Sequence, residues 1–390
     1  MTAVELIYFN AGGGHRAAAR ALEAVLQQRY PHWDVRTTNL FEIVDPREQF
    51  RRVTSMAPED FYNRQLALGW SIGLEQQLRV LQAAVRAGHG FLVRRLRDYW
   101  ERTRPDLVVS LIPNFNRPLH DGLRSALPAV PYVTVMTDLA DFPPHFWVEP
   151  GTSQVVVCGT EHARSQALAA GMPADQLRRV SGMIVRPDFY DPLPPDAVSR
   201  ADLGLEPGRP TGIVMFGGHG SMAMQKIARQ LPDVQLILIC GHNQALARRL
   251  RSNPAGPGHA VVEFTPHVRQ YMGIADFFIG KPGPGSISEA VQQGLPVITT
   301  RNRWTMPQER YNADWVREQR LGIVVRSTGR IGGAVRELLP QLQEFKANVA
   351  RIDNRAVFEV PDILAEILGE PARDAAAASA LLEPVRVRRR

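Results

Sequence analysis

The chain has 390 residues, of which 44% are hydrophobic and 22% charged, an ordinary composition for a globular protein of two or three domains. No apolar run approaches the roughly 20 residues that a membrane-spanning helix needs. The formal net charge of +7 favours an anionic partner, such as a phosphorylated substrate, lipid headgroups or nucleic acid. Aromatic residues make up only 7% and no recognition motif appears, so no nucleic-acid partner is expected.

Cysteine and lysine are both rare in this chain. Cys158 and Cys240 lie far apart in apolar runs, which predicts buried free thiols in a reducing cytoplasm and no metal site. Nearly all the positive charge is arginine, and the lysines are Lys226, Lys281 and Lys346. Lys281 therefore stands out, because it falls in the most unusual loop of the sequence.

Short apolar, β-branched runs alternate with helical patterns along the chain. In the first half, the runs cover residues 4–10, 35–40, 106–113, 132–138, 154–160 and 177–183. In the second half, they cover residues 212–218, 234–241, 260–265, 276–281, 296–300 and 323–326. Continuous apolar runs are typical of strands buried on both faces, and their alternation with helices predicts parallel sheets with right-handed crossovers.

Residues 186–210 separate the two sets of runs, because they contain six prolines and little periodicity. The sequence thus predicts two doubly wound, Rossmann-like α/β domains, 1–190 and 191–340, that face a cleft and bind ligands at the carboxyl ends of their strands. Residues 341–368 have an amphipathic helical pattern and are expected to pack back on the first domain. Residues 369–390 are expected to be a disordered basic tail.

In each half of the chain, a glycine-rich turn follows the first predicted strand. The first is Asn10-Ala-Gly-Gly-Gly-His15-Arg16 and the second is Phe216-Gly-Gly-His-Gly-Ser221. Glycines between a parallel strand and a helix allow backbone N–H groups to approach an anion at the helix N-terminus. A purely structural tight turn is an equally good interpretation of the first motif alone. His15, in the first helical turn, is expected to project over the cleft.

The third glycine-rich segment, Gly280-Lys-Pro-Gly-Pro-Gly-Ser-Ile-Ser-Glu289, predicts a phosphate-binding loop at a helix N-terminus. Its prolines fix φ, which makes a rigid loop that loses little entropy on binding. Lys281 precedes the glycines, so it does not match the lysine of a P-loop. Ser286 and Glu289 have the spacing of a capping box. The alternative is that Glu289 accepts hydrogen bonds from ribose hydroxyls.

Residues 66–100 are the candidate membrane-binding segment. An apolar stripe of Leu74, Leu78, Leu81 and Val85 lies near five arginines, at positions 79, 86, 94, 95 and 97. A basic amphipathic helix can lie on an anionic lipid surface. The alternative is an ordinary core-facing helix whose outer face carries the charges.

Taken together, these motifs resemble the GT-B glycosyltransferases of the monogalactosyldiacylglycerol synthase type, relatives of the MurG enzyme of peptidoglycan synthesis in glycosyltransferase family 28. The matching segments are residues 12–17, 137–139, 185–187, 281–290 and 307–309 with Asn312. They occur in the family's order and span about residues 4–330.

The resemblance implies a UDP-sugar in the second domain and an acceptor in the first. The residues implied around the diphosphate are Gly217, Gly218, Gly283, Gly285, Ser286 and Arg186. Glu289 would hold the ribose, Thr265 would lie near uracil, and Gln308 and Glu309 would contact the sugar. The acceptor would lie near Gly13, Gly14 and Asn114. Asp138 is the candidate base, with His15 as the second choice. A helix N-cap remains open for Asp138, as does an interdomain ion pair for Arg186.

The resemblance implies an inverting, metal-independent transfer of galactose or glucose from a UDP-hexose to a lipid, diacylglycerol in the first place, with no cofactor. The loop amides and helix dipole would stabilise the leaving diphosphate. The implied location is the cytoplasm, peripheral on the inner, anionic face of the plasma membrane. A UDP-sugar epimerase and a non-catalytic sugar-nucleotide-binding protein are the alternatives.

The sequence departs from the family pattern in its first half. Ile112 and Arg117 stand where histidines are expected, and Pro143-Pro144-His145 replaces a His-Pro pair. The nucleotide is therefore better supported by the sequence than the acceptor.

Overall fold

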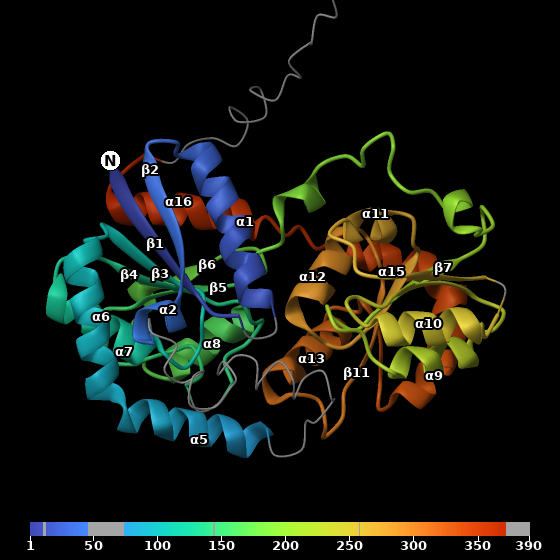
Figure 1. The fold of residues 1–390 in the computed structure, drawn as a ribbon, viewed down its shortest axis with the longest axis horizontal. Helices are drawn as coiled ribbons and strands as arrows, with labels where there is room; N and C mark the ends of the chain where they lie inside the picture. The colour runs from blue at the N-terminus through green and yellow to red at the C-terminus, as the bar shows by residue number, and fades with distance from the viewer. Residues whose placement is uncertain (11–12, 46–73, 143–144, 257, 372–390) are drawn as a thin grey trace, which may run out of the picture.

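The computed structural model describes residues 1–10, 13–45, 74–142, 145–256 and 258–371. Over these residues the chain forms two α/β domains side by side, each built on a six-stranded parallel sheet flanked by helices (Figure 1). Residues 66–73 of the candidate membrane segment, Gly12, the Pro143-Pro144 pair and the tail from 372 onward lie outside the described residues. Among the described helices, none is long and apolar enough to cross a membrane.

The first sheet has the strand order β2-β1-β3-β4-β5-β6. Its strands are β1 (Thr2–Tyr8), β2 (Trp33–Asn39), β3 (Leu107–Ser110), β4 (Tyr132–Val135), β5 (Val155–Cys158) and β6 (Leu177–Arg179). The helices of this domain are α1 (Gly14–Arg29), α2 (Leu40–Val44), α5 (Leu74–Ala87), α6 (His89–Thr103), α7 (Asn116–Ala126) and α8 (Glu161–Ala169). Every residue of β3 and β4 is buried, as continuous apolar runs predict.

The second sheet has the order β12-β11-β10-β7-β8-β9. Its strands are β7 (Thr211–Met215), β8 (Gln235–Ile239), β9 (His259–Val262), β10 (Phe277–Gly280), β11 (Val297–Thr300) and β12 (Gly322–Val325). Its helices are α9 (Ala223–Gln230), α10 (Gln244–Ser252), α11 (Val268–Gly273), α12 (Pro284–Gln292), α13 (Arg310–Glu318), α14 (Ile331–Leu338) and α15 (Leu342–Val349). The predicted fold class is thus confirmed, since each predicted apolar run overlaps one strand of these two sheets.

Several predicted runs extend past the carboxyl end of their strand. The run 132–138 is the clearest case, because β4 ends at Val135 although Met136 and Thr137 remain buried. Apolar residues continue there because the loop after the strand is itself packed against the core. As a result, Asp138 lies in a loop beyond the sheet rather than at the end of a strand.

The end of the chain crosses back to the first domain (Figure 1). α15 stays with the second domain, where Lys346 Nζ lies 2.8 Å from Asp276 Oδ1. The last helix, α16 (Ala356–Leu368), packs against α1 of the first domain. There the buried Arg29 donates a hydrogen bond to Asp362 Oδ1 at 2.9 Å. The two domains are therefore joined at two places, by the proline-rich segment and by the chain before α16.

The strand orders place the glycine-rich loops at the cleft. In the first sheet the order reverses between β1 and β3, and in the second between β7 and β10. Ligands of doubly wound sheets bind outside the carboxyl ends of the strands at this switch point. The loops after β1, β7 and β10 are the three glycine-rich segments of the sequence, so their positions follow from the topology.

Candidate active site in the interdomain cleft

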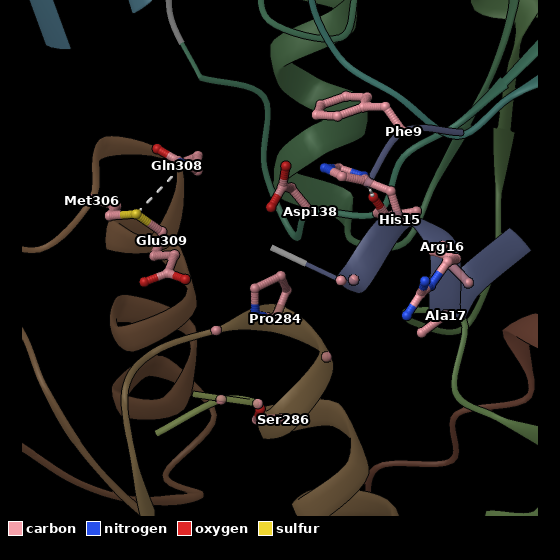
Figure 2. Close-up of a pocket in the computed structure, with 18 of the residues that line it drawn as sticks. Phe9, His15, Arg16, Ala17, Asp138, Pro284, Ser286, Met306, Gln308 and Glu309 are labelled. Carbon is pink, nitrogen blue, oxygen red and sulfur yellow. Dashed lines mark hydrogen bonds between the residues drawn. The ribbon is translucent and has the colours of Figure 1, made fainter. Parts of the chain in front are cut away.

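A cavity of about 1150 Å³ lies between the domains and is lined by both of them. Every residue that the sequence assigned to catalysis, donor binding or acceptor binding lines this cavity. Figure 2 shows Asp138 and His15 on one side and, facing them, Pro284, Ser286, Gln308 and Glu309. The elements that meet here are the N-termini of α1 and α12 and the loops after β4, β7 and β11.

The phosphate-binding loop is held close to the sheet and left open toward the cavity. A Cβ on Gly280 would lie 2.5 Å from Met215 O, so only glycine fits where β10 passes β7. Asn312, fully buried, donates a hydrogen bond to Pro282 O at 2.8 Å and fixes the start of the loop. A Cβ on Gly285 would meet no described atom within 4 Å. The backbone at Gly285 is therefore accessible from the cavity.

The capping box predicted as one interpretation of Ser286 and Glu289 does not form. α12 begins after Gly283, so Ser286 is already inside the helix, and no described side chain caps the helix N-terminus. The N–H groups of the first turn are thus left for an anionic ligand. Glu289 instead lies 3.7 Å from Arg186 Nε. Burial raises the pKa of Glu289 to about 7, and the charge of Arg186 opposes this shift.

Arg186 forms the interdomain ion pair that was one interpretation of the sequence, while its contact with a diphosphate stays a prediction. Its guanidinium pairs with Glu289 of the second domain and with Asp188, each at 3.7 Å, and it also lines the cavity. The guanidinium lies 5.0 Å from the centroid of the Phe189 ring. These contacts leave it at the edge of the cavity, beside Glu289.

The loop that carries Gln308 and Glu309 forms the far side of the donor half. Glu309 Oε1 lies 2.8 Å from Lys281 Nζ, and the Glu309 side chain is only 8% exposed. Gln308 Nε2 lies 3.8 Å from Met306 Sδ. Both side chains are carried by the short 3-10 helix Pro307–Glu309, which opens α13. Thr265, by contrast, lines the cavity beyond β9, where its Oγ1 accepts a hydrogen bond from the His267 N–H.

Asp138 is buried on the opposite wall and does not act as a helix N-cap. Its Oδ2 accepts a hydrogen bond from the Trp147 indole N–H at 3.0 Å. Burial raises the pKa of Asp138 to about 7, helped by the charge of Glu309 across the cleft, while Trp147 and Lys281 oppose the shift. The result is a carboxyl group that changes protonation near neutral pH, as a general base requires.

His15 is held in a fixed, uncharged state beside this carboxyl group. Its Nδ1 lies 2.8 Å from Thr137 Oγ1, and its ring also hydrogen-bonds to the backbone of Leu111. Burial lowers its pKa to about 4. The Phe9 ring lies 4.9 Å from the imidazole, centroid to centroid. With its hydrogen-bonding positions occupied, His15 is better suited to positioning than to accepting a proton.

The acceptor half is bordered by apolar side chains. Asn114, with a φ of 65°, accepts a hydrogen bond from Gln82 of α5 at 3.1 Å and lines the cavity. The aromatic residues around it are Phe9, Phe41, Phe115 and Phe146. α5 lines the cavity with Val80 and Leu81, which are 67% and 40% exposed.

The apolar stripe predicted for membrane binding is divided by the tertiary structure. Leu78 and Val85 are buried in the core of the first domain, as the core-facing interpretation predicts, whereas Leu81 is 40% exposed. Leu78 and Leu81 both line the cavity. The side chain of Leu74 lies outside the described residues. The stripe as a whole is therefore not a free surface, because its described members are buried in the core or line the cavity.

Comparison with known proteins places this site in a family. The model of the monogalactosyldiacylglycerol synthase family matches residues 15–185, and the model of the glycosyltransferase family 28 C-terminal domain matches residues 213–367. Together they account for both walls of the cavity. The chain is a GT-B glycosyltransferase of the monogalactosyldiacylglycerol synthase and MurG-like family.

Individual relatives of this glycosyltransferase agree with that assignment. It is 29% identical over 356 residues to a probable monogalactosyldiacylglycerol synthase of Nicotiana tabacum, covering 85% of this chain and 63% of the relative. It is 28% identical to monogalactosyldiacylglycerol synthase 1 of Arabidopsis thaliana, covering 94% and 71%. The chain thus spans about two thirds of the length of these curated relatives.

Solved structures establish the fold of the glycosyltransferase. Acinetobacter baumannii MurG superimposes with a TM-score of 0.58 at 13% identity, over 94% of this chain and 100% of that one. The S. aureus MnaA–UDP structure gives a TM-score of 0.59 at 12% identity, over 96% and 100%. At these identities the likeness concerns the GT-B architecture alone.

The departures noted in the acceptor half lie within the part that the monogalactosyldiacylglycerol synthase model matches. Ile112 is fully buried in the core of the first domain, and Arg117 Nε lies 4.0 Å from Glu149 Oε2. The family model thus matches the first half despite these departures, and the expectation that the nucleotide is better supported than the acceptor stays a prediction.

Two aromatic residues of the site were missed by the sequence reasoning. Trp147, fully buried, holds Asp138 through its indole, and nothing in the spacing of nine residues indicated this contact. Phe264 is 55% exposed, lines the donor half and stacks on His242 with ring centroids 4.0 Å apart. Its position directly before Thr265 was the only available signal.

Replacing Glu289 by glutamine is expected to weaken UDP binding by about 1–3 kcal/mol. This is the cost of impairing hydrogen bonds to the ribose hydroxyls of UDP, which are buried when the nucleotide is bound. Because burial already disfavours the ionised carboxylate, the melting temperature should not fall. Calorimetric titration with UDP and a thermal melt measure the two effects. The Glu344→Gln control, which breaks the Arg320–Glu344 pair outside the cavity, should leave UDP affinity unchanged. A lower melting temperature with unchanged UDP affinity would assign Glu289 a purely structural role.

Proposed function

We propose that this chain is an inverting, metal-independent glycosyltransferase that moves galactose or glucose from a UDP-sugar to a lipid acceptor, diacylglycerol in the first place. One observation carries the proposal: a helix N-terminus without a side-chain cap faces a buried carboxyl group, whose pKa is about 7, across one cavity. The first binds an anionic leaving group, and the second accepts a proton from an acceptor hydroxyl.

The donor would lie along the second domain. Its diphosphate would meet the open backbone of Gly285, the neighbouring backbone of Gly283 and the loop at Gly217, where φ is +73°. Its ribose would meet Glu289, and its sugar would meet Gln308 and Glu309. The α12 N-terminus has no side-chain cap, which supports charge stabilisation by the loop amides and the helix dipole.

The transfer would be a single displacement. The acceptor oxygen forms a bond to C1 of the sugar as the bond between C1 and the diphosphate oxygen breaks, and Asp138 takes the hydroxyl proton. Asp138 and the phosphate-binding loop lie on opposite walls of the cavity, which supports attack from the side opposite the leaving group and inversion at C1. His15 would orient Thr137 and, through it, the loop that carries Asp138.

The apolar acceptor half supports a lipid acceptor. The family name of the relatives supports diacylglycerol and galactose. Phe91, 49% exposed, lies under the Arg95 guanidinium at 5.4 Å on α6, the helix that follows α5. Such a basic, partly apolar surface supports peripheral binding to the anionic, cytoplasmic face of a membrane.

The test is to incubate the full chain with UDP-galactose or UDP-glucose and vesicles containing diacylglycerol, with and without anionic lipid and with a chelator present. Mass spectrometry should detect a hexosyl-diacylglycerol, and proton NMR should show the inverted anomer. Conversion of the donor sugar without an acceptor would instead indicate an epimerase. UDP binding without any product would indicate a non-catalytic binding protein.

The acceptor assignment predicts a specific effect of Leu81→Ser. The substitution removes apolar contact at the cavity mouth and should raise KM for the lipid acceptor about 10-fold or more, because burying a leucine contributes about 1.5–3 kcal/mol. Leu168→Ser is a matched control, since Leu168 is 37% exposed and lies outside the cavity lining. Equal effects of the two substitutions, or a change in UDP affinity, would contradict the assignment.

A further inference from the structure

Lysine is nearly absent from this chain, yet one lysine lies inside the donor half of the cavity. Among the described residues that line the cavity, the cationic side chains are Arg16, Arg186 and Lys281. Arg186 lies at the edge of the cavity beside Glu289. Lys281 belongs to the loop after β10 and pairs with Glu309 at 2.8 Å. Lys281 is therefore the cation that reaches from the start of the phosphate-binding loop to the loop assigned to the sugar.

The path of the Lys281 side chain runs between the two glycine-rich loops of the second domain. A Cβ on Gly217 would lie 3.7 Å from Lys281 Cε, and a Cβ on Gly283 would lie 3.4 Å from it. The lysine thus passes the backbones of both loops at the switch point of the sheet, where a doubly wound domain binds its phosphates. Although Lys281 precedes the helix, unlike a P-loop lysine, its ammonium reaches the same space.

Glu309 gives the ammonium a fixed position. Its carboxylate is 8% exposed, whereas the Lys281 side chain is 36% exposed, so the pair is anchored at the carboxylate and accessible at the lysine. The ammonium has further donor hydrogens beyond the one that Glu309 accepts. The charges of both residues also act on Asp138 across the cavity, which places the pair opposite the carboxyl group. The ammonium is therefore held between the diphosphate loop and the proton acceptor. This is the region in which negative charge would develop on the leaving group.

We propose that Lys281 is the residue that neutralises the leaving diphosphate, a role that rests on the proposed glycosyl transfer. When the bond between C1 and the β-phosphate oxygen breaks, its electron pair stays on that oxygen, and the UDP product carries one more negative charge than the bound donor did. Lys281 Nζ donates a hydrogen bond to the β-phosphate while Glu309 keeps the ammonium in place. Glu309 thereby serves the sugar site and positions the cation.

The test compares Lys281→Met, which removes the charge, with Lys281→Arg, which keeps it. Loss of one preorganised donor at a site of developing charge typically lowers kcat about 100- to 1000-fold. We therefore expect Lys281→Met to lose kcat by that factor, to raise the dissociation constant of UDP and to leave KM for the lipid acceptor unchanged. Lys281→Arg should retain most of the UDP affinity.

Lys346→Met is the matched control. Like Lys281, Lys346 forms a 2.8 Å ion pair with a carboxylate, here that of Asp276, and its side chain is 32% exposed. Lys346 lies outside the cavity lining. This variant should keep both kcat and UDP affinity. If Lys281→Met behaves like Lys346→Met, with only a change in melting temperature, the Lys281–Glu309 pair is structural and the inference is wrong.

The UDP titrations need no acceptor, so they separate this inference from the proposed function. If the wild-type chain binds UDP but transfers no sugar, the proposed function fails, and the role of Lys281 in the transfer fails with it. Weaker UDP binding by Lys281→Met would then still locate the ammonium at the diphosphate. If the wild-type enzyme transfers sugar and Lys281→Met changes neither UDP affinity nor kcat, the inference about Lys281 is wrong while the proposed function stands.

Discussion

Asp138→Asn is expected to lower kcat about 100- to 10,000-fold while UDP affinity stays at the wild-type value, because a positioned general base contributes a factor of this size. Asparagine keeps the oxygen that accepts the Trp147 indole hydrogen bond, so the loop should retain its shape. What is lost is the ability to take the acceptor proton. Steady-state transfer assays and UDP titration measure the two quantities separately.

The pH dependence of the wild-type enzyme tests the same assignment. Asp138 must be ionised to act as a base, and burial raises its pKa to about 7. The acidic limb of kcat/KM should therefore fall near pH 7 rather than near pH 4, with activity rising as the pH increases. Glu149 has a pKa also raised to about 7 by burial, but it lies outside the cavity lining, so Glu149→Gln should keep this limb in place. A limb that persists in residual Asp138→Asn activity would exclude Asp138 as its source.

The Asp138→Asn substitution should lower activity but should not lower the free energy of unfolding at alkaline pH. A carboxyl group whose pKa is raised on folding loses its stabilising contribution as the pH rises from its unfolded value near 4 toward about 7. Above pH 7 the wild type therefore carries a buried ionised carboxylate, and the asparagine variant does not. Thermal melts at pH 8 should show the variant at least as stable as the wild type. A large fall in melting temperature would attribute the lost activity to misfolding.

Replacing Gly285 is expected to weaken UDP binding without harming the fold. A Cβ at this position meets no described atom within 4 Å, and Gly285 lies in the first turn of α12, where alanine is favoured over glycine by up to about 1 kcal/mol. The added side chain points into space that a diphosphate must occupy to reach the loop backbone. We expect Gly285→Ala to weaken UDP binding about 10-fold, or about 1.4 kcal/mol, and Gly285→Leu to weaken it further.

Gly333→Ala is the control for Gly285→Ala. Gly333 lies in α14, also has no described atom within 4 Å of a built Cβ, and is outside the cavity lining. It should raise or keep the melting temperature and leave UDP affinity unchanged. The diphosphate would have to bind elsewhere if Gly285→Leu bound UDP as tightly as the wild type.

The sequence by itself determined the architecture and the position of the glycine-rich loops at the cavity. Alternating apolar runs and helical patterns are local signals, and parallel strands can be connected only by crossovers, so twelve runs predicted two doubly wound sheets. The glycine-rich turns follow particular strands, and topology alone brings their carboxyl ends to one edge. The family motif between Gly280 and Glu289 then led to the prediction that this loop binds a diphosphate.

Only the tertiary structure decided the surroundings of the individual charged groups. The pairing of Glu289 with Arg186 instead of a helix cap and the ion pair of Lys281 with Glu309 each join residues far apart in the sequence. The contact of Trp147 with Asp138 depends on how the long connection between β4 and β5 folds back on itself. The pKa of Asp138 depends on its burial and on a carboxylate carried by the other domain. Periodicity reports which face of an element is apolar, whereas protonation and ion pairing depend on the packing of one domain against another, which no local pattern encodes.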